Sequence, residues 1–371
     1  MSPSSPIDIS VDDVRVMLER HEPVTLLDVR EAADRAEWSI PGSLHADRYQ
    51  ALRAGDRAAL DGIDLPEGIP VVTVCGRGVT SLIAATLLRE RGIAARSLEG
   101  GMHAWSLAWN AAERVLPGGA TIVQLRRTGK GCLSYLIGSD GEAVAIDVAL
   151  DPAVFVEIAA ERGWTITHVF DTHVHADHLS RSRLLAEATG ATMHLPANDR
   201  VSYPFVPLHD GDVIAFGTAQ IKAIDTPGHT GESMSYLVDD QALFTGDTLF
   251  LAGVGRPDLE ASAAEARLRA NRLWASLQRL TALPPETLVL PGHTSMPVAF
   301  DGELIAAPLR EVVAQVSALQ RNQDSFVAWI LAQLPPPPPN HAVIVALNEA
   351  GDWPAGDPVE LEAGANRCAV G

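Results

Sequence analysis

The sequence of 371 residues predicts a two-domain protein in which an α/β domain precedes an α+β domain. In residues 1–113, strands rich in β-branched residues alternate with helical stretches, which is typical of a parallel sheet with helices on both faces. In residues 121–305, many short strands separated by Gly and Asp turns are mixed with helices, which favours an αββα sandwich. Residues 114–120 predict a turn-rich linker, and residues 306–371 predict a helical, proline-rich tail packed on the second domain.

The elements of the first domain follow from local signals. Ser10 is a residue type that caps helices, so a helix is predicted to begin directly after it, over VDDVRVMLER. Buried strands are predicted where apolar residues run almost without charge, in VTLLDVR (24–30) and PVVTVCG (70–76). Two further helices are predicted over SLIAATLLRERG (81–92) and HAWSLAWN (103–110).

The second domain shows short strands in rapid succession. They are predicted over TIVQLRR, SYLIG, EAVAID, ATMHLP, DVIAFG, AQIKAID, SMSYLVD and ALFTGD. Helices are predicted between some of them, over residues 152–163, 179–190 and 262–280. In the tail, the run LPPPPPN (334–340) favours stiff, extended backbone.

The composition restricts the class of partner. A net charge of −19 argues against non-specific binding to nucleic acid or to an anionic membrane. The sequence has no apolar core of a secretory signal and no apolar stretch of membrane-spanning length. Cys75, Cys132 and Cys368 lack CxxC spacing, which indicates a reducing compartment rather than a disulfide framework. We therefore expect a cytoplasmic protein, and the sequence leaves open whether it forms a homodimer.

The segment DTHVHADHL (171–179) indicates a metal site. It places His173, His175 and His178 with Asp177 in the pattern H-x-H-x-D-H, at a predicted turn between a strand and a helix. Imidazoles this crowded repel one another when protonated, so a bound cation best explains the pattern. The histidines that occur singly are interpreted as ordinary surface or core residues, namely His21, His45, His103, His168, His194, His209 and His341.

Three more residues of types that bind metals follow predicted strands further along the chain. His229 lies in IDTPGHT, Asp247 in LFTGDTLF and His293 in LVLPGHT. In this order, with the histidine segment, they resemble the metallo-β-lactamase superfamily over roughly residues 121 to 300. The resemblance implies the sandwich fold and a metal site at the seven matching positions.

The resemblance implies one of two chemistries. In the persulfide dioxygenase branch, one Fe(2+) is held by the residues matching His173, His229 and Asp247, and the others orient ligands and water. In the hydrolase branch, of which glyoxalase II is the nearest type, two Zn(2+) ions use all seven positions and a bridging hydroxide attacks a thioester. His175, Asp177, His178 and His293 are therefore either residues that orient the iron ligands or ligands of a second metal.

The segment GVGRPDL (253–259) favours the dioxygenase. It resembles the Gly-x-Gly-Arg-x-Asp segment of that branch, whereas glyoxalase II enzymes carry aromatic residues and Glu-Gly after the arginine. Arg256 is accordingly a candidate clamp for an anionic substrate, with Asp258 as its partner. The alternative is an Arg–Asp pair that braces a loop.

Residues 7 to about 112 resemble a single rhodanese (sulfurtransferase) domain. The resemblance rests on LLDVREAADRAEWSIPGSLHA (26–46), VCGRGVTSLIAATLLRERG (74–92) and LEGGMHAW (98–105). Cys75 ends a strand and precedes a glycine-rich turn and a helix, where main-chain N–H groups favour a thiolate or persulfide anion. Arg77 adds a positive charge for a sulfur donor. Thr80 stands where many rhodaneses carry arginine, so the loop is less cationic and activity toward thiosulfate is expected to be weak.

The leading hypothesis is a persulfide dioxygenase that oxidises a low-molecular-weight thiol persulfide, glutathione persulfide first of all, with O2 to sulfite and thiol. Cys75 would transfer sulfane sulfur in the fused domain. The alternatives are a dinuclear zinc thioester hydrolase and a non-enzymatic persulfide carrier or sensor. Cys132 begins a predicted strand and is interpreted as structural, and Cys368 lies in a tail that we expect to be mobile.

Overall fold

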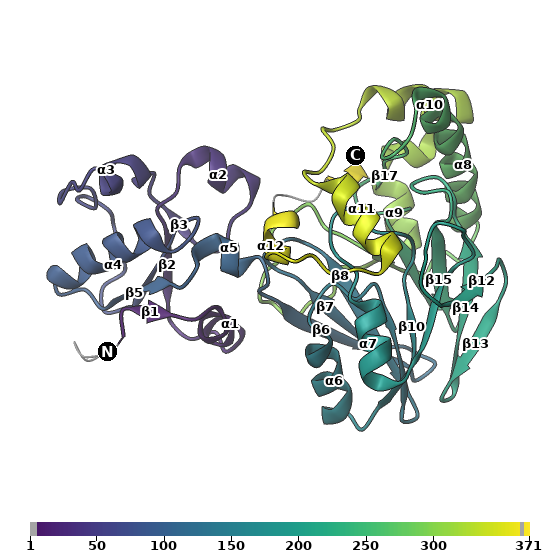
Figure 1. Ribbon diagram of the computed structural model, residues 1–371, viewed down its shortest axis with the longest axis horizontal. Coiled ribbons are helices and arrows are strands. Elements are labelled where there is room, and N and C mark those ends of the chain that lie inside the picture. Colours follow the sequence, from purple (N-terminus) through teal and green to yellow (C-terminus); the bar gives the residue numbers. More distant parts are fainter. Residues whose placement is uncertain (1–5, 364–366) are drawn as a thin grey trace.

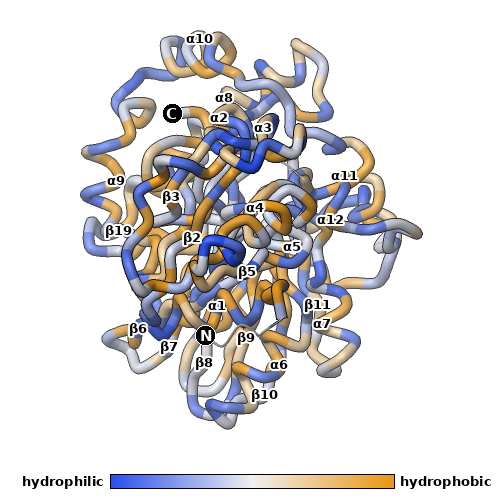
Figure 2. Tube along the Cα trace, turned by 90° about the vertical axis from the view of Figure 1, so that its left-hand side faces the viewer, coloured by the Kyte–Doolittle hydropathy of each residue, from blue (hydrophilic) through white to orange (hydrophobic). Residues whose placement is uncertain are grey.

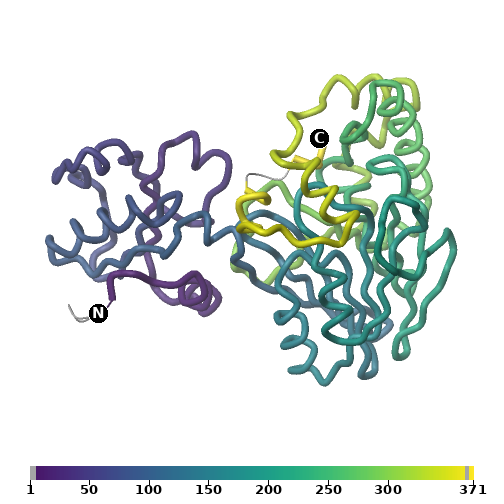
Figure 3. The backbone as a smooth tube through the Cα atoms, in the orientation of Figure 1, coloured from purple at the N-terminus to yellow at the C-terminus, as the bar shows by residue number. Residues whose placement is uncertain are grey.

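The computed structural model describes residues 6–363 and 367–371, which form two domains side by side (Figure 1). The trace in Figure 3 runs through the smaller N-terminal domain first and then builds the larger domain, whose last segments return toward the first. None of the helices in the described part of the chain combines the length and apolar character that crossing a membrane requires.

The N-terminal domain is built on a sheet of five parallel strands. Their spatial order is β1 (Asp8–Ile9), β5 (Ala95–Leu98), β4 (Val71–Val74), β2 (Thr25–Asp28) and β3 (Leu44–His45). The helices are α1 (Val11–Glu19), α2 (Ala32–Glu37), α3 (Tyr49–Arg53), α4 (Val79–Glu90) and α5 (Gly101–Trp105). Ser10 caps α1 as predicted, because its hydroxyl accepts a hydrogen bond from the Asp13 N–H.

Both faces of this sheet are covered, as the alternation of strand side chains requires. Leu27 and Val71 pack with residues of α3 and α4, whereas Leu26 and Val72 pack on the opposite face with α1 and Trp105 of α5. In Figure 2, orange hydrophobic segments gather around β2 and α4, and blue hydrophilic segments lie in connecting loops. The predicted parallel sheet with helices on both faces is therefore confirmed.

The second domain contains two sheets. One has the order β12 (Val206–Leu208), β11 (Thr192–Pro196), β10 (Thr165–Phe170), β9 (Glu142–Ile146), β8 (Leu133–Ser139), β7 (Thr121–Arg126) and β6 (Asn110–Val115). The other has the order β13 (Val213–Phe216), β14 (Ala219–Asp225), β15 (Met234–Val238), β16 (Ala242–Gly246), β18 (Leu288–Pro291) and β19 (Ala307–Pro308). A short pair, β17 (Val254–Gly255) and β20 (Ala369–Val370), lies apart from both.

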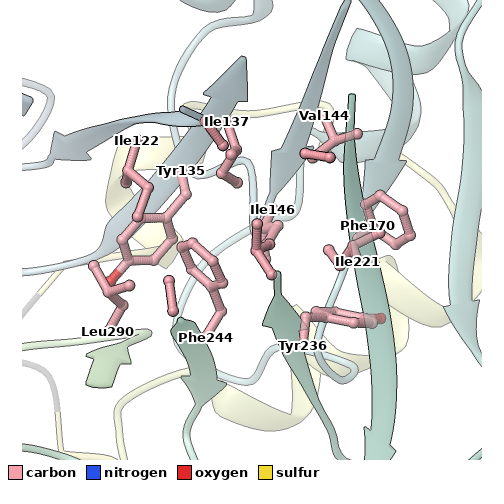
Figure 4. Close-up of a cluster of buried hydrophobic side chains, with 14 of the residues drawn as sticks. Ile122, Tyr135, Ile137, Val144, Ile146, Phe170, Ile221, Tyr236, Phe244 and Leu290 are labelled. Atoms are coloured by element: carbon pink, nitrogen blue, oxygen red, sulfur yellow. The ribbon is translucent and has the colours of Figure 1, made fainter. Parts of the chain in front are cut away.

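Three apolar layers hold these sheets and their helices together. Between the sheets, Tyr135 of β8 meets Phe244 of β16 edge-on, with ring centroids 4.8 Å apart (Figure 4). The outer face of the first sheet packs on α6 (Pro152–Glu161) and α7 (Ser182–Thr189). The outer face of the second packs on α8 (Ala263–Thr281), α9 (Leu309–Gln315) and α10 (Gln323–Ala332). The predicted αββα sandwich is confirmed.

The segment between the domains differs from its prediction. The helix expected over residues 103–110 ends at Trp105, and Asn110 already begins β6. The expected linker 114–120 is instead the end of β6 and the turn of a β6–β7 hairpin. Leu116 and Ala120 are buried in the core between the sheets, so this turn belongs to the second domain. Its glycines signal a tight turn in a hairpin as readily as a linker, and their local sequence does not distinguish the two.

The C-terminal tail packs along the second domain through helices α9 and α10, a 3-10 turn (Ser317–Gln320), α11 (His341–Ala350), α12 (Pro358–Leu361) and β20. The expectation of a mobile Cys368 is wrong, because its side chain is only 1% exposed. The Cys368 carbonyl accepts a hydrogen bond from the Arg256 N–H, and the next two residues pair with β17. Main-chain pairing across a long sequence separation fixes this segment.

A buried carboxylate anchors the tail to the loop between β10 and α7. Glu362 is fully buried and contacts the guanidinium groups of Arg127 at 2.5 Å and Arg181 at 3.1 Å. It also accepts a hydrogen bond from the Leu179 N–H. Burial alone would raise the pKa of Glu362, but the two arginines outweigh it and lower the pKa to about 2. The ion pair therefore stabilises the folded tail only while the carboxylate is ionised.

Replacing this carboxylate tests the anchor. Glu362→Gln leaves two buried arginines without their counter-charge and is expected to cost about 3 kcal/mol at neutral pH. The pKa of Glu362 is lower in the folded protein than its ordinary 4.5. The difference between wild type and variant should therefore be full above pH about 4.5 and shrink as the pH falls toward about 2. Urea unfolding followed by tryptophan fluorescence measures it.

Glu360→Gln is a matched control, because the same substitution two residues away affects a side chain that is 47% exposed. It should change the free energy of unfolding by less than about 1 kcal/mol. Equal effects of the two variants, or a loss in Glu362→Gln that does not depend on pH, would contradict the assignment.

Candidate metal centre and sulfurtransferase site

The structure brings all seven predicted metal-site residues together at one edge of the sandwich. His173, His175, Asp177 and His178 lie in the loop between β10 and α7, which we call the metal loop (residues 171–181). His229 lies in the turn after β14. Asp247 directly follows β16, and His293 follows β18 after one intervening glycine. All seven side chains are at most 4% exposed. Strand ends that are distant in sequence thus supply one buried cluster.

Within the cluster, His173, His229 and Asp247 form a group whose ligand atoms all lie within 4.8 Å of one another. The His229 Nδ1 lies 2.8 Å from the Arg256 carbonyl oxygen and the His173 Nδ1 lies 2.9 Å from the Thr172 hydroxyl, contacts that orient each ring. The His173 Nε2 and the Asp247 Oδ2 find no hydrogen-bond partner among the described residues. Buried polar atoms without partners are costly, so this group fits a cation.

A second group contains Asp177, His178 and His293 together with Cys132, again within 4.8 Å. The His293 Nδ1 lies 2.6 Å from Asp247 Oδ1 and its Nε2 lies 2.7 Å from Asp177 Oδ2. Burial disfavours the charged ring, but these two carboxylates raise the pKa of His293 well above its ordinary value. The His293 ring therefore lies as a bridge between the two carboxylates.

Cys132 is a member of this cluster that sequence reasoning missed. It was interpreted as a structural residue, yet its Sγ lies 3.7 Å from Asp177 Oδ2. Burial and Asp177 raise its pKa, but His178 and His293 outweigh them and lower the pKa of the thiol to about 6. Cys132 forms an isolated bridge with His293, a pairing between residues 161 positions apart that no local signal announces.

His175 makes different contacts from the other six residues. Its Nε2 lies 3.2 Å from Asp147 Oδ1 and 3.8 Å from Asp171 Oδ1, in a third buried group. Burial opposes protonation, but Asp147 and Asp171 raise the pKa of His175 well above its ordinary value. Asp147 also accepts hydrogen bonds from the N–H and hydroxyl of Thr172. Asp147 was missed by sequence reasoning, although a carboxylate directly after a buried strand is a usable signal.

The metal loop is held from outside by the C-terminal region. The Asn348 side-chain amide donates to the carbonyl oxygens of His175 and His178, each at 2.9 Å. Its oxygen accepts from the Ser180 N–H, also at 2.9 Å. Asn348 thus satisfies three main-chain groups of a buried irregular loop. It was also missed, because one asparagine within a helix carries no local signal.

The predicted substrate clamp at Arg256 is wrong. Arg256 is 1% exposed, and its guanidinium donates two hydrogen bonds to the Asp258 carboxylate at 2.8 Å. The remaining donors bind the carbonyl oxygens of Pro335, Pro336 and Arg367. All five guanidinium N–H groups are therefore used within the chain, and none remains for a substrate. The pair braces a loop, ties the proline run and tail to the site, and positions the carbonyl that contacts His229.

A cavity of about 460 Å³ adjoins the metal cluster at His293. Phe250, Leu251 and Met296 give it apolar walls, and the tail contributes Ala369 and Gly371. Because the tail residues line this cavity, the C-terminal segment shapes the approach to the metal cluster.

In the N-terminal domain, Cys75 follows β4 and precedes α4, as predicted. Gly78 adopts φ 85° at the N-cap of α4. Gly101 packs so tightly that an added Cβ would lie 2.3 Å from the Cys75 carbonyl oxygen and 2.7 Å from the Gly78 nitrogen. The Cys75 Sγ lies 3.3 Å from the Ser81 hydroxyl, and the residue, which is only 2% exposed, lines a cavity of about 780 Å³ together with Arg77 and Thr80. This close packing presents the thiol at the helix N-terminus.

Comparison with known proteins agrees with both domains. Residues 127–293 match the family described as the metallo-beta-lactamase superfamily, and residues 10–108 match the rhodanese-like domain. A hydroxyacylglutathione hydrolase from Methylococcus capsulatus is 39% identical over 209 residues, which cover 54% of this chain and 78% of that protein. A protein of the same name from Rhizobium etli is 42% identical over 156 residues, which cover 41% of this chain and only 57% of the relative.

Two solved structures share the fold of the second domain. A metallo-beta-lactamase from Staphylococcus aureus subsp. aureus COL superposes with a TM-score of 0.57 at 28% identity, covering 62% of this chain and 73% of that one. ETHE1 from Myxococcus xanthus superposes with a TM-score of 0.54 at 33% identity, covering 62% of this chain and 99% of that one. The chain therefore belongs to the metallo-beta-lactamase superfamily and carries an N-terminal rhodanese-like domain.

Releasing the tail tests the bracing function of Arg256. Arg256→Lys keeps the charge but cannot make five hydrogen bonds, so the segment formed by Cys368 and β20 should open more often. We expect alkylation of Cys368, measured by peptide mass spectrometry, to become about tenfold faster, which corresponds to the loss of one or two net hydrogen bonds. Alkylation of Cys132, which is equally buried and lies directly before β8, is the internal control. An unchanged rate at Cys368 would contradict the bracing.

Proposed function

We propose that this protein is a persulfide dioxygenase with a fused sulfurtransferase domain. Its substrates would be a low-molecular-weight thiol persulfide, glutathione persulfide first of all, and O2, and its products sulfite and the thiol. The observation that carries the proposal is the group of His173, His229 and Asp247, two imidazoles and one carboxylate with their ligand atoms within 4.8 Å. This is the ligand set typical of non-haem Fe(2+) oxygenases.

The surrounding contacts support a single metal at this group. His293 lies between Asp177 and Asp247, with its Nδ1 hydrogen-bonded to Asp247 Oδ1, and His175 is turned to Asp147 and Asp171. These residues would hold the ligands in position and keep a proton on His293 Nδ1, facing Asp247 Oδ1. When bound, Fe(2+) would supply the one-electron chemistry that activates O2 and a position for the persulfide sulfur. Asp247 would keep its Oδ2 for the metal, because its Oδ1 is occupied by His293.

The N-terminal domain would handle sulfane sulfur. Cys75 lines a cavity at the N-terminus of α4, the end of a helix at which anionic ligands are favoured. Cys75 would carry sulfur as a persulfide and Arg77 would attract anionic donors or acceptors. The similarity to ETHE1 of Myxococcus xanthus over nearly that whole protein supports the dioxygenase assignment.

The second candidate is a dinuclear zinc thioester hydrolase. Two observations favour it: the relatives named hydroxyacylglutathione hydrolase, and the second ligand group of Asp177, His178 and His293 beside the first. Two bound Zn(2+) ions would supply a hydroxide nucleophile in place of redox chemistry. We rank it second because the His293 Nδ1 is hydrogen-bonded to Asp247, a ligand of the first group, and because the rhodanese-like domain has no evident use in thioester hydrolysis.

Metal content and oxygen consumption decide between the two. Protein purified without added metal should contain about one iron per chain, and iron-loaded protein should consume O2 with glutathione persulfide. About two zinc ions per chain, with thioester hydrolysis and no oxygen uptake, would overturn the proposal in favour of the hydrolase.

Two variants separate the activities of the domains. Asp247→Ala should remove the metal and oxygen uptake, because one of three ligands is lost, while Cys75 still accepts sulfur. Cys75→Ser should remove sulfur transfer and leave metal content and oxygen uptake within about twofold of wild type. Metal analysis, an oxygen electrode and persulfide labelling of Cys75 measure the three properties. Loss of all activity in both variants would contradict independent sites.

A further inference from the structure

Arg77, beside the sulfurtransferase thiol, is paired with a residue of the other domain. Its Nη2 lies 2.7 Å from Oε1 of Glu360, on α12 of the C-terminal tail. The same carboxylate oxygen lies 3.3 Å from the His103 Nε2, and the Asp357 Oδ2 lies 3.4 Å from that nitrogen. Figure 1 shows α12 at the boundary between the domains, next to α5, which carries His103. Glu360 thus faces a guanidinium and an imidazole from the rhodanese-like domain, and Asp357 faces the imidazole alone.

These two basic groups are fixed to the loop that carries Cys75. The His103 N–H donates to the Gly76 carbonyl at 2.9 Å, and the Met102 N–H donates to the Cys75 carbonyl at 2.8 Å. Arg77 belongs to the loop itself. The positions of both basic side chains are therefore coupled to the position of the Cys75 loop.

Arg77 also lies between two cavities. The first, of about 780 Å³, contains Cys75, and the second, of about 260 Å³, lies between the domains and contains His103 and Glu360. Gly76 and Arg77 line both. The pairing with Glu360 holds the arginine charge at the cavity between the domains.

We propose that Arg77 and His103 form an oxyanion site at the cavity between the domains, next to the loop of Cys75, and that Glu360 occupies it in this structure in place of a sulfur oxyanion such as sulfite or thiosulfate. A carboxylate and these oxyanions share the feature that the site recognises, namely negatively charged oxygens that accept from a guanidinium and an imidazole. This inference rests on the proposed sulfurtransferase function and adds His103 and Glu360 to it. Glu360 then sets how strongly anionic sulfur compounds bind.

The exposure of the pair makes displacement inexpensive. The side chains of Arg77 and Glu360 are 66% and 47% exposed, so their attraction is weakened by water and salt. An exposed pair of this kind contributes up to about 1 kcal/mol, which corresponds to at most about fivefold in affinity. A small dianion can compete with such a contact. Binding of an oxyanion at this site would therefore be reversible, and Glu360 of the C-terminal tail would compete with it.

Alkylation of Cys75 by an anionic and a neutral reagent tests the charge directly. The ratio of the iodoacetate rate to the iodoacetamide rate, measured by peptide mass spectrometry, reports how much free positive charge lies beside the thiol. Glu360→Gln should raise this ratio by about two- to fivefold at low ionic strength, and about 1 M salt should abolish most of the rise. Arg77→Gln should lower the ratio below that of wild type.

Two controls separate this effect from others. In the Arg77→Gln background, Glu360→Gln should have no further effect, and Glu67→Gln, at an exposed site of the same domain, should leave the ratio unchanged. A ratio that does not rise in Glu360→Gln, a rise that persists without Arg77, or an equal rise with both reagents would overturn the proposal. An equal rise would mean that the domains separate rather than that charge is released.

Calorimetry on the full chain with Cys75→Ser identifies the oxyanion. Sulfite and thiosulfate are titrated separately, with Cys75→Ser/Arg77→Gln as the blank for binding elsewhere. Glu360→Gln and His103→Gln should respectively tighten and weaken binding by about two- to fivefold. Tighter binding of sulfite alone, thiosulfate alone or both assigns the ligand, and no change for either overturns the proposal. Since neither measurement needs turnover, failure here is distinct from failure of the proposed enzyme activity.

Discussion

The structure depends on hydrogen-bonding and charge partners for the buried metal loop. This loop places three imidazoles and several carboxylates where water is excluded, and each buried polar group needs a partner or a cation. Asp147 and Asp171 face His175, and His293 joins Asp177 to Asp247. Atoms that find no hydrogen-bond partner within residues 6–363 and 367–371, such as the His173 Nε2 and the Asp247 Oδ2, point to the place of a metal. The same pairing rule thus both stabilises the loop and identifies the site.

The C-terminal tail, which lies outside the sandwich, supplies several of the partners that these buried polar groups need. Asn348 binds main-chain groups of the metal loop, Glu362 neutralises Arg127 and Arg181, and the Arg256–Asp258 pair binds the proline run. The tail also reaches the other domain through Glu360, while Arg127 donates to the Ser106 carbonyl there. A segment that looks like an appendage in the sequence therefore contacts both functional sites.

Much of the fold and of the site could be predicted. Apolar strands and helix signals were sufficient to predict the architecture of each domain, because hydrophobic periodicity and helix capping are local properties of the sequence. The spacing within DTHVHADHL was sufficient for a metal site, and three further strand-end residues joined it as expected. The linker at residues 114–120 and the helix over 103–110 failed, because turn residues and short apolar runs do not reveal which sheet the backbone will join.

The sequence by itself determined the two domains, the seven residues at the metal cluster and the cysteine at the head of its helix, since each depends on nearby residue types. Only the tertiary structure decided the partners of those residues. In the structure, Arg256 pairs with Asp258 and does not face a substrate. Cys132 and Asp147 lie at the metal cluster, and Glu360 pairs with Arg77. The physical reason is that hydrogen bonds and ion pairs act over a few ångströms, and which distant residues come that close is settled by packing.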